Sequence, residues 1–398
     1  MPVLIDLDAA PPPAPARSRR LPWRRLRIAA AAAAVLLLLG AAAAPPVAVV
    51  FPRVADTGGR SAVAVLLTPQ ALVTAHPASG GDEIDVVARP LAPGGPSWRS
   101  RLSLPARDSL RLSRSGSVLV VDDELTVRIL DAATGRERWA VGPDDSALVT
   151  GDRVLLTRYD AAGASELRLA ELETGRVRWS RPGEAFAAVL GDAGRYLFTL
   201  AADGRAEVRS AVDGRLLGSR PLNESVDPDD PDVAVVGERV YVLGPASVTA
   251  LRLADLTPAW RSPARVPMPT GATRCGDLVC FPGERGLTAV DAGTGATRWS
   301  APEWVAYSGG VASARDRRTV LLDPATGRVI RRLGRGRATG GLMLRVDGDH
   351  TRVSDLRTGR AYGTLPGVLP YGCTAAGDLL ACPQAGGTTV WRVLRTAS

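Results

Sequence analysis

Four cysteines are the residues of this 398-residue chain whose spacing most suggests chemistry. Cys275 and Cys280 enclose a Gly-Asp turn at the start of a strand-like run, and Cys373 and Cys382 enclose another near the C-terminus. In an oxidising compartment each pair suits a disulfide within a hairpin. We predict two structural disulfides, Cys275–Cys280 and Cys373–Cys382. A redox-active pair is the alternative, although Cys-x-x-Cys spacing is absent from both.

Two histidines are the remaining candidates for acid–base or metal chemistry. His76 follows a strand-like run and precedes Pro77, and His350 ends an Asp-Gly-Asp turn. Either could act as a general base, but no nucleophile motif accompanies them. A zinc site would need more histidine near the cysteines. We therefore predict no catalytic residue, no metal site and no cofactor.

Charged residues gather in two places. Residues 223–232 (NESVDPDDPD) could offer carboxylates to calcium, but their spacing is not that of an EF-hand loop. A solvated insertion is the better interpretation, and a partner-facing loop would look the same. The second cluster consists of arginines that could meet anionic headgroups or wall polymers, although an arginine-rich coding bias explains them equally well. Its members are Arg315, Arg317, Arg318, Arg328, Arg331, Arg332, Arg335 and Arg337. Trp304 and Tyr307 precede the arginine cluster in the sequence. They could line a binding face or could simply fill space between blades.

These residues lie within a repeated unit, seen most fully in residues 289–299. The unit reads as the end of a strand, a turn on Thr294-Gly295 and a second strand that carries Trp299. Asp291 can accept backbone N–H groups of the turn, and Gly295 supplies the positive φ that a hairpin turn requires. The tryptophan is a large planar side chain suited to wedging between neighbouring sheets.

The unit recurs with corner positions about forty residues apart, and about thirty-two apart in the last two units. The residues that carry it are Trp98, Asp131, Thr134, Gly135, Trp139, Thr174, Gly175, Trp179, Trp260, Asp291, Thr294, Gly295 and Trp299. Short alternating apolar runs predict strands throughout. This period predicts an all-β propeller of four-stranded blades. Eight full units and a two-strand remnant favour eight blades over seven, with Ala62–Leu67 completing the last sheet.

The motif and its period resemble the PQQ-like repeat of the quinoprotein dehydrogenase-like propeller superfamily, whose docking motif reads Ala-x-Asp-x-x-Thr-Gly-(Lys/Gln/Arg)-x-x-Trp. Residues 289–299, 129–139 and 169–179 match it, with substitutions at Ala296, at Ile129, and at Leu169 and Glu171. The resemblance covers roughly residues 60–395. It implies an eight-bladed propeller whose tryptophans dock one blade on the next.

The resemblance does not bring the quinone cofactor with it. Quinoprotein dehydrogenases hold the quinone with a disulfide between adjacent cysteines, a stacked tryptophan and calcium, and no two cysteines are adjacent here. The chain is more similar to the non-catalytic members, such as the propeller lipoprotein of outer-membrane assembly and the anchored repeat proteins of Gram-positive envelopes.

The N-terminal region predicts a membrane anchor. Residues 1–27 should be a disordered basic tail, and the uncharged residues 28–50 are long enough to span a bilayer as a helix. Six arginines precede the span, which favours a cytoplasmic N-terminus and an extracytoplasmic propeller; a cleaved signal peptide is the competing interpretation. We expect residues 51–60 to be a linker and residues 61–398 to be the propeller.

Charge and location bound the function. The formal net charge is +8, but residues 1–27 contribute six arginines and two aspartates, a net +4, so the rest does not argue for nucleic acid. We predict a single-pass cell-membrane protein whose propeller is a non-catalytic scaffold for an envelope protein or polymer. A PQQ-dependent oxidoreductase and an envelope sensor are the alternatives.

Overall fold

The computed structural model describes residues 51–394 apart from 60, 79–81, 106–108, 143, 160–164, 186, 192–193, 202, 223–232, 245–246, 263–265, 267–268 and 385. The chain divides into two compact units, Met1–Ala48 and Val49–Ser398, and the described residues all belong to the second. The predicted tail and membrane span lie outside the described residues. In the part that is described, no helix has the length and apolar character needed to cross a bilayer.

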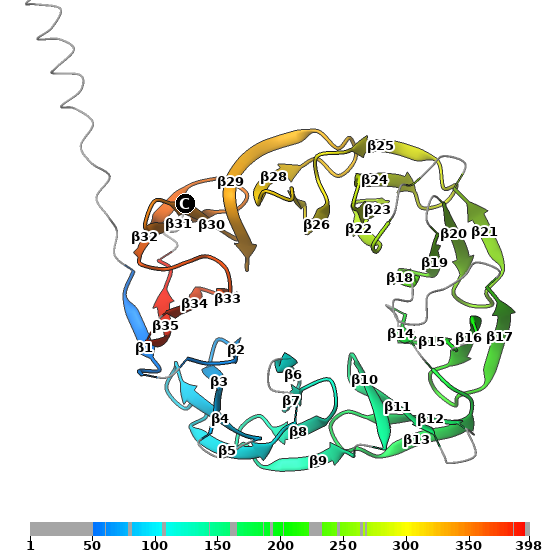
Figure 1. Cartoon of the computed structure of the whole chain (residues 1–398), viewed down its shortest axis with the longest axis horizontal. Coiled ribbons are helices and arrows are strands. Elements are labelled where there is room, and N and C mark those ends of the chain that lie inside the picture. Colours follow the sequence, from blue (N-terminus) through cyan, green and yellow to red (C-terminus); the bar gives the residue numbers. More distant parts are fainter. Residues whose placement is uncertain are drawn as a thin grey trace, which may run out of the picture. The chain divides into compact units, whose positions relative to one another are not determined.

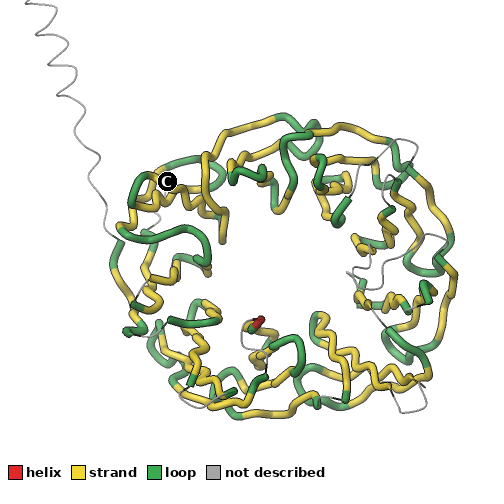
Figure 2. The backbone as a smooth tube through the Cα atoms, viewed as in Figure 1, coloured by secondary structure: helices red, strands yellow, loops and turns green. Residues whose placement is uncertain are grey.

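The regular structure of this unit is built from antiparallel strands grouped in blades around a ring (Figures 1 and 2). Blade 1 contains β2 (Ala64–Leu67), β3 (Ala71–Pro77), β4 (Glu83–Pro90) and β5 (Trp98–Ser103). Blade 2 contains β6 (Arg111–Ser115), β7 (Val118–Asp122), β8 (Val127–Asp131) and β9 (Glu137–Val141). Blade 3 contains β10 (Asp145–Thr150), β11 (Arg153–Tyr159), β12 (Ser165–Glu171) and β13 (Val177–Pro182). Blade 4 contains β14 (Ala187–Leu190), β15 (Tyr196–Leu200), β16 (Arg205–Ser210) and β17 (Leu216–Pro221).

The second half of the ring continues the pattern. Blade 5 contains β18 (Val233–Val236), β19 (Arg239–Leu243), β20 (Val248–Arg252) and β21 (Pro258–Arg261). Blade 6 contains β22 (Thr273–Cys275), β23 (Leu278–Gly283), β24 (Gly286–Asp291) and β25 (Thr297–Ala301). Blades 7 and 8 contain β26 (Ala306–Ser308), β27 (Val311–Ser313), β28 (Arg318–Leu322), β29 (Val329–Thr339), β30 (Leu342–Asp347), β31 (His350–Asp355) and β32 (Ala361–Pro366). Blade 9 contains β33 (Thr374–Ala376), β34 (Leu379–Gln384), β35 (Gly387–Arg392) and β1 (Arg53–Asp56).

Blades 1 to 8 run from the inside of the ring to its rim in chain order, and blade 9 runs from β33 through β34 and β35 to β1 on the rim (Figure 1). In the motif units the pairing of the third and fourth strands shifts just before the turn, for example between Ile129 and Leu130 and between Ala289 and Val290. A bulge of this kind bends the strand and increases its twist.

The hydrophobic core is divided among the seams between blades. Val73, Ala75 and Ile84 of blade 1, for instance, form one buried cluster with Leu119 and Val121 of blade 2. Successive side chains of a strand point to opposite faces of its sheet, and the inner strands carry apolar side chains on both faces. Each blade is therefore covered on both faces by its two neighbours.

Ring closure differs from the prediction. The fourth strand of the last blade is β1, which pairs with β35 through Arg53 and Trp391, Ala55 and Val390, and Asp56 and Thr389. Ala62–Leu67 was expected in that place; its residues 64–67 are instead the innermost strand of blade 1. The expected linker, 51–60, therefore contains the closing strand. Its four residues, Arg-Val-Ala-Asp, are too short to show a strand pattern.

The blade count also needs correction. Within the described residues the strands form eight hydrogen-bonded sheets but nine four-stranded blades, so both eight and seven blades are undercounts. The difference is β29, whose first part pairs with β28 as the rim strand of blade 7 and whose last part, from Gly336, pairs with β30 as the innermost strand of blade 8. The C-terminal remnant is a ninth blade because β1 completes it.

Candidate binding surfaces

The corner tryptophans each contact the turn of the following blade. The indole N–H donates to a backbone carbonyl there at 2.9–3.4 Å: Trp98 to Ala132, Trp139 to Leu172, Trp179 to Ala211, Trp260 to Ala292 and Trp299 to Pro324. The ring lies over the turn glycine. A Cβ built on Gly135 would lie 2.3 Å from Trp98, and one on Gly175 would lie 2.8 Å from Trp139. These turns therefore require glycine for space as well as for positive φ.

An aspartate organises the turn in the motifs at residues 129–139 and 289–299. Asp131 Oδ1 accepts the backbone N–H of Ala133 at 3.0 Å and of Thr134 at 2.9 Å, while Oδ2 accepts Arg138 Nη2 at 2.6 Å. The Arg138 hydrogen bond, followed by that of the Thr134 hydroxyl, lowers the pKa of Asp131 to about 2. Asp291 has the same arrangement, and its pKa is also lowered to about 2, first by Arg298.

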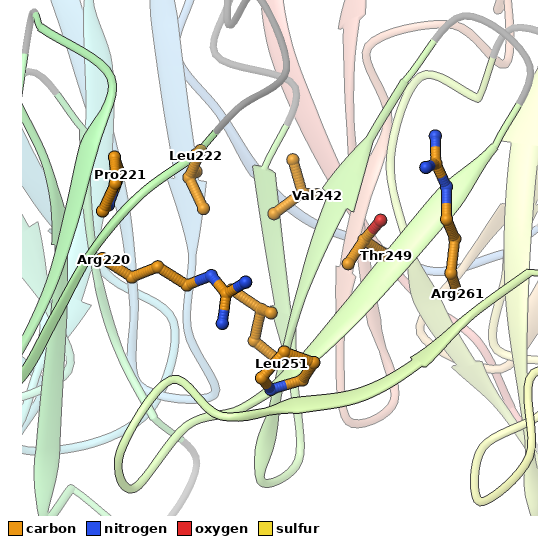
Figure 3. Close-up of a pocket in the computed structure, with 8 residues that line it drawn as sticks. Arg220, Pro221, Leu222, Val242, Thr249, Leu251 and Arg261 are labelled. Carbon is orange, nitrogen blue, oxygen red and sulfur yellow. The ribbon is translucent and has the colours of Figure 1, made fainter.

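The seam between blades 4 and 5 exchanges the two docking residues. Gly218 stands at the corner position where blades 1, 2, 3, 5 and 6 carry tryptophan, and Leu256 stands where the turn glycine would be, with φ of 59°. A Cβ on Gly218 would lie 2.7 Å from the Asp255 carbonyl oxygen, and the Leu256 side chain is buried. Beside this exchange lies a pocket of about 210 Å³ between β17 and blade 5, and its lining includes Arg220, Val242 and Leu251 (Figure 3).

Both predicted disulfides are confirmed. Cys275 pairs with Cys280 across the β22–β23 hairpin, and Cys373 pairs with Cys382 between the segment before β33 and strand β34. All four side chains are buried in seam cores. A buried disulfide offers no attacking thiolate, so these pairs act as staples.

The two histidines lie in different settings. His350 is exposed, and its Nδ1 is 2.5 Å from Asp349 Oδ1 in the same turn. His76 is buried on β3, with Nε2 2.8 Å from Thr74 Oγ1. It lines a polar cavity of about 420 Å³ at the seam of blades 9 and 1.

That cavity holds functional candidates that the sequence reasoning missed. Asp85, on β4 opposite His76, is 2% exposed and is bound by Arg99 Nη2 at 2.5 Å and Arg101 Nε at 3.1 Å. The hydrogen bond from Arg99 is the largest cause that lowers the pKa of Asp85 to about 2. The sequence does contain a signal for this site, which is an aspartate inside the otherwise apolar run Ile84–Val87. A carboxylate buried in such a strand requires hydrogen-bond or ion-pair partners, so it indicates a polar site.

The arginine-rich surface, comprising the eight arginines of residues 315–337, lies on blade 7 and the start of blade 8. Of these eight, Arg318 is the one that forms an ion pair within the described residues, with Asp316 at 2.6 Å. Arg318 and Arg335 are direct cross-strand neighbours. Arg331 replaces the corner tryptophan and lies over Gly359, and its Nη1 is buried with no hydrogen-bond partner among the described residues.

Trp304 and Tyr307 are both buried, and only Trp304 lines a cavity beside this surface. That cavity of about 220 Å³ also includes Glu303, Arg318 and Arg332. Tyr307 packs in the core of the seam between blades 6 and 7. The acidic segment 223–232 lies outside the described residues.

Three examples represent the solved structures that match this chain. BamB from Moraxella catarrhalis is 18% identical over 88% of this chain and 99% of its own, with a TM-score of 0.48. The computationally designed Ika8 protein is 14% identical over 86% and 99%, with a TM-score of 0.48. The C-terminal WD40 domain of Sif2 is 12% identical over 86% and 98%, with a TM-score of 0.44. No curated protein matches the sequence.

The blades and their tryptophan-docked turns define a PQQ-like β-propeller. The sequence model of a family described as outer membrane protein assembly factor BamB matches residues 82–224 and 182–391. The chain belongs to this family.

Proposed function

We propose that the protein is a non-catalytic scaffold of the cell envelope, held by a span at residues 28–50, whose propeller binds an anionic partner through the arginine-rich surface. Membership of a family described as an assembly factor supports a binding role. The two disulfides support an oxidising compartment for the propeller.

The observation that carries the proposal is the concentration of charge. Residues 315–337 contain eight arginines and two aspartates, a net +6, whereas residues 51–398 as a whole carry +4. The other residues of 51–398 therefore carry a net charge of −2, so the excess positive charge of this region comes from residues 315–337. Guanidinium groups bind carboxylates and phosphates in bidentate fashion, so this surface suits an anionic partner.

The PQQ-dependent alternative fits the residues less well. The disulfides join cysteines five and nine positions apart, and neither provides the adjacent pair expected of a quinone site. Titration of the protein with PQQ and calcium tests this alternative. Micromolar binding of PQQ, with an absorbance that changes on reduction of the bound quinone, would favour a dehydrogenase over a non-catalytic scaffold.

Position-specific photocrosslinking in intact cells of the native host tests the scaffold. A photoreactive amino acid replaces Arg337, which is exposed on β29, and in a second strain it replaces Arg195. Arg195 is also exposed, but it is paired with Glu238 in another part of the ring, so it serves as the matched control.

We expect a discrete adduct from position 337 and none from position 195. The adduct should fade when Arg332 and Arg335 are both replaced by Gln, because two positive charges are lost from the surface. Equal adducts from both positions, or an adduct unaffected by the double replacement, would show that the partner does not bind through the arginine-rich surface.

A further inference from the structure

The seam that closes the ring has an apolar core, which includes Leu72 of blade 1 and Val390 of blade 9, and carries buried polar side chains beside it. Strands β3 and β4 of blade 1 turn one face, with Val73, Ala75 and Ile84, to the core shared with blade 2. The opposite face, toward blade 9, carries His76 and Asp85, both buried. Burial of such groups is unfavourable unless hydrogen bonds compensate. The closing seam therefore contains a polar region, at His76 and Asp85, in addition to its apolar core.

The wall of the closing-seam cavity on the blade 9 side is the segment that follows β1. Arg89 holds this segment by donating from Nη1 to the Asp56 carbonyl at 3.0 Å and from Nη2 to the Thr57 carbonyl at 3.1 Å. Gly58 and Gly59 follow with φ near +60°, and no atom lies within 4 Å of a Cβ built on either. The segment is thus fixed at Thr57 and open above the two glycines.

The charges that line the cavity are mainly positive. Arg89 and Arg99 both face it, and Asp85 is the carboxylate among its lining residues. Asp85 is already neutralised by Arg99 and by Arg101 behind it. A guanidinium has more N–H donors than these bonds use: within the described residues Arg89 donates two hydrogen bonds and Arg99 one.

We infer that this cavity binds a small organic anion whose carboxylate or phosphate is held between Arg89 and Arg99. His76 lines the same cavity, with Nε2 2.8 Å from Thr74 Oγ1 and Nδ1 3.4 Å from the Ser61 carbonyl oxygen, and Val87 supplies an apolar wall for the carbon part of the ligand. A volume of about 420 Å³ suits a molecule of the size of citrate or a sugar phosphate. Because its walls come from blade 1 and from the segment that follows β1, the closing strand of blade 9, the bound anion also stabilises the closed ring.

Histidine-selective NMR of the full-length protein in detergent micelles tests this site. The chain has only two histidines, so each gives one resolvable C2–H signal. Inorganic phosphate, citrate and neutral glucose are titrated in parallel. We expect the His76 signal to shift saturably with phosphate or citrate, and whichever anion acts identifies the group bound. The exposed His350 should give no saturable shift.

Two variants locate the site. Arg99→Gln should weaken binding by about tenfold or more, since it removes a charged hydrogen-bond donor from the cavity. Arg158→Gln is the matched control: Arg158 likewise shares an aspartate, Asp145, with a second arginine, but it lies in blade 3. Arg89→Gln replaces the first variant if Arg99→Gln fails to fold. No saturable His76 shift with either anion up to about 10 mM, or equal weakening by Arg158→Gln, would overturn the proposal.

Discussion

At the scale of single residues, the turn aspartates connect the repeat to pH-dependent stability. Ionised Asp131 accepts two backbone N–H groups and Arg138, and its folded-state pKa of about 2 lies below the ordinary value of 3.8. A lowered carboxyl pKa stabilises the folded state above about pH 4, and this contribution is lost as the pH falls toward 2.

Replacing Asp131 with Asn should therefore flatten the dependence of the melting temperature on pH between 4 and 2. At pH 7 we expect a loss of about 1–2 kcal/mol of unfolding free energy, because the charged hydrogen bonds are gone. Thermal melts across this pH window measure both effects. Asp277→Asn, at an exposed turn position, is the control and should match the parent protein. An unchanged pH slope in Asp131→Asn would contradict the turn mechanism.

Substitutions at two turn glycines can distinguish the cost of backbone strain from the cost of a clash with tryptophan. Gly175 and Gly151 have similar φ angles of 70° and 64°, but only Gly175 would place a Cβ within 3 Å of an indole, that of Trp139. Gly151→Ala should cost about 1 kcal/mol for the backbone alone. Gly175→Ala should cost about 1–3 kcal/mol more, since the ring must move. Denaturant unfolding of the two variants gives the difference, and equal losses would show that docking does not depend on the close approach.

At the scale of elements, the seam between blades 4 and 5 shows that docking can be exchanged between blades. Gly218→Trp alone would clash with Asp255, and Leu256→Gly alone would lose a buried side chain, each costing about 2–4 kcal/mol. Together they restore the Trp–Gly pair found in other seams. We therefore expect the double variant to be more stable than the sum of the two losses by about 0.5–3 kcal/mol.

A double-mutant cycle from denaturant melts measures that coupling. Leu365→Ala, which removes a buried side chain from the seam of blades 8 and 9, is combined with Gly218→Trp as the distant control and should be additive. Coupling no larger than in this control would indicate that the exchange at 218 and 256 is coincidental.

The elements also show how far the sequence reasoning reached. Turn and strand positions could be predicted because Asp, Thr-Gly and alternating apolar residues act locally, and the hairpin cysteines could be paired for the same reason. Strand β1 could not be predicted, because so short a strand is defined by its pairing with the distant strand β35 and not by its own four residues. The uncounted blade is the C-terminal remnant, whose fourth strand is β1, whereas the two units that share β29 could be recognised from their Thr-Gly turns. The Asp85 cavity depends on contacts across the closing seam, which no local pattern specifies.

At the scale of the whole molecule, the closing strand makes the N-terminal edge of the propeller essential to the ring. Phe51 is 2% exposed in the core of the last blade, and β1 follows two residues later. Removing residues 1–50 should leave the folded ring intact. Removing residues 1–59 should lower the melting temperature by about 5 °C or more and promote self-association, because β35 becomes an exposed edge.

Calorimetry and size-exclusion chromatography of these two truncations check this prediction. Indistinguishable melting temperatures would mean that the β1–β35 pairing does not hold the ring closed. A lower melting temperature for the shorter truncation already would place part of the stability in residues 1–50.

The central claim is a binding scaffold displayed outside the membrane, and the redox state of its cysteines in the native cell tests it most directly. Cells expressing the full chain or residues 51–398 are denatured in the presence of a maleimide-linked polymer that adds mass to each free thiol. The account predicts that the full chain acquires no polymer without reductant, because all four cysteines are in disulfides formed after export, whereas residues 51–398 alone acquire it readily. Polymer on the full chain without reductant, to the same extent as on residues 51–398, would place the propeller in the cytoplasm and contradict the account.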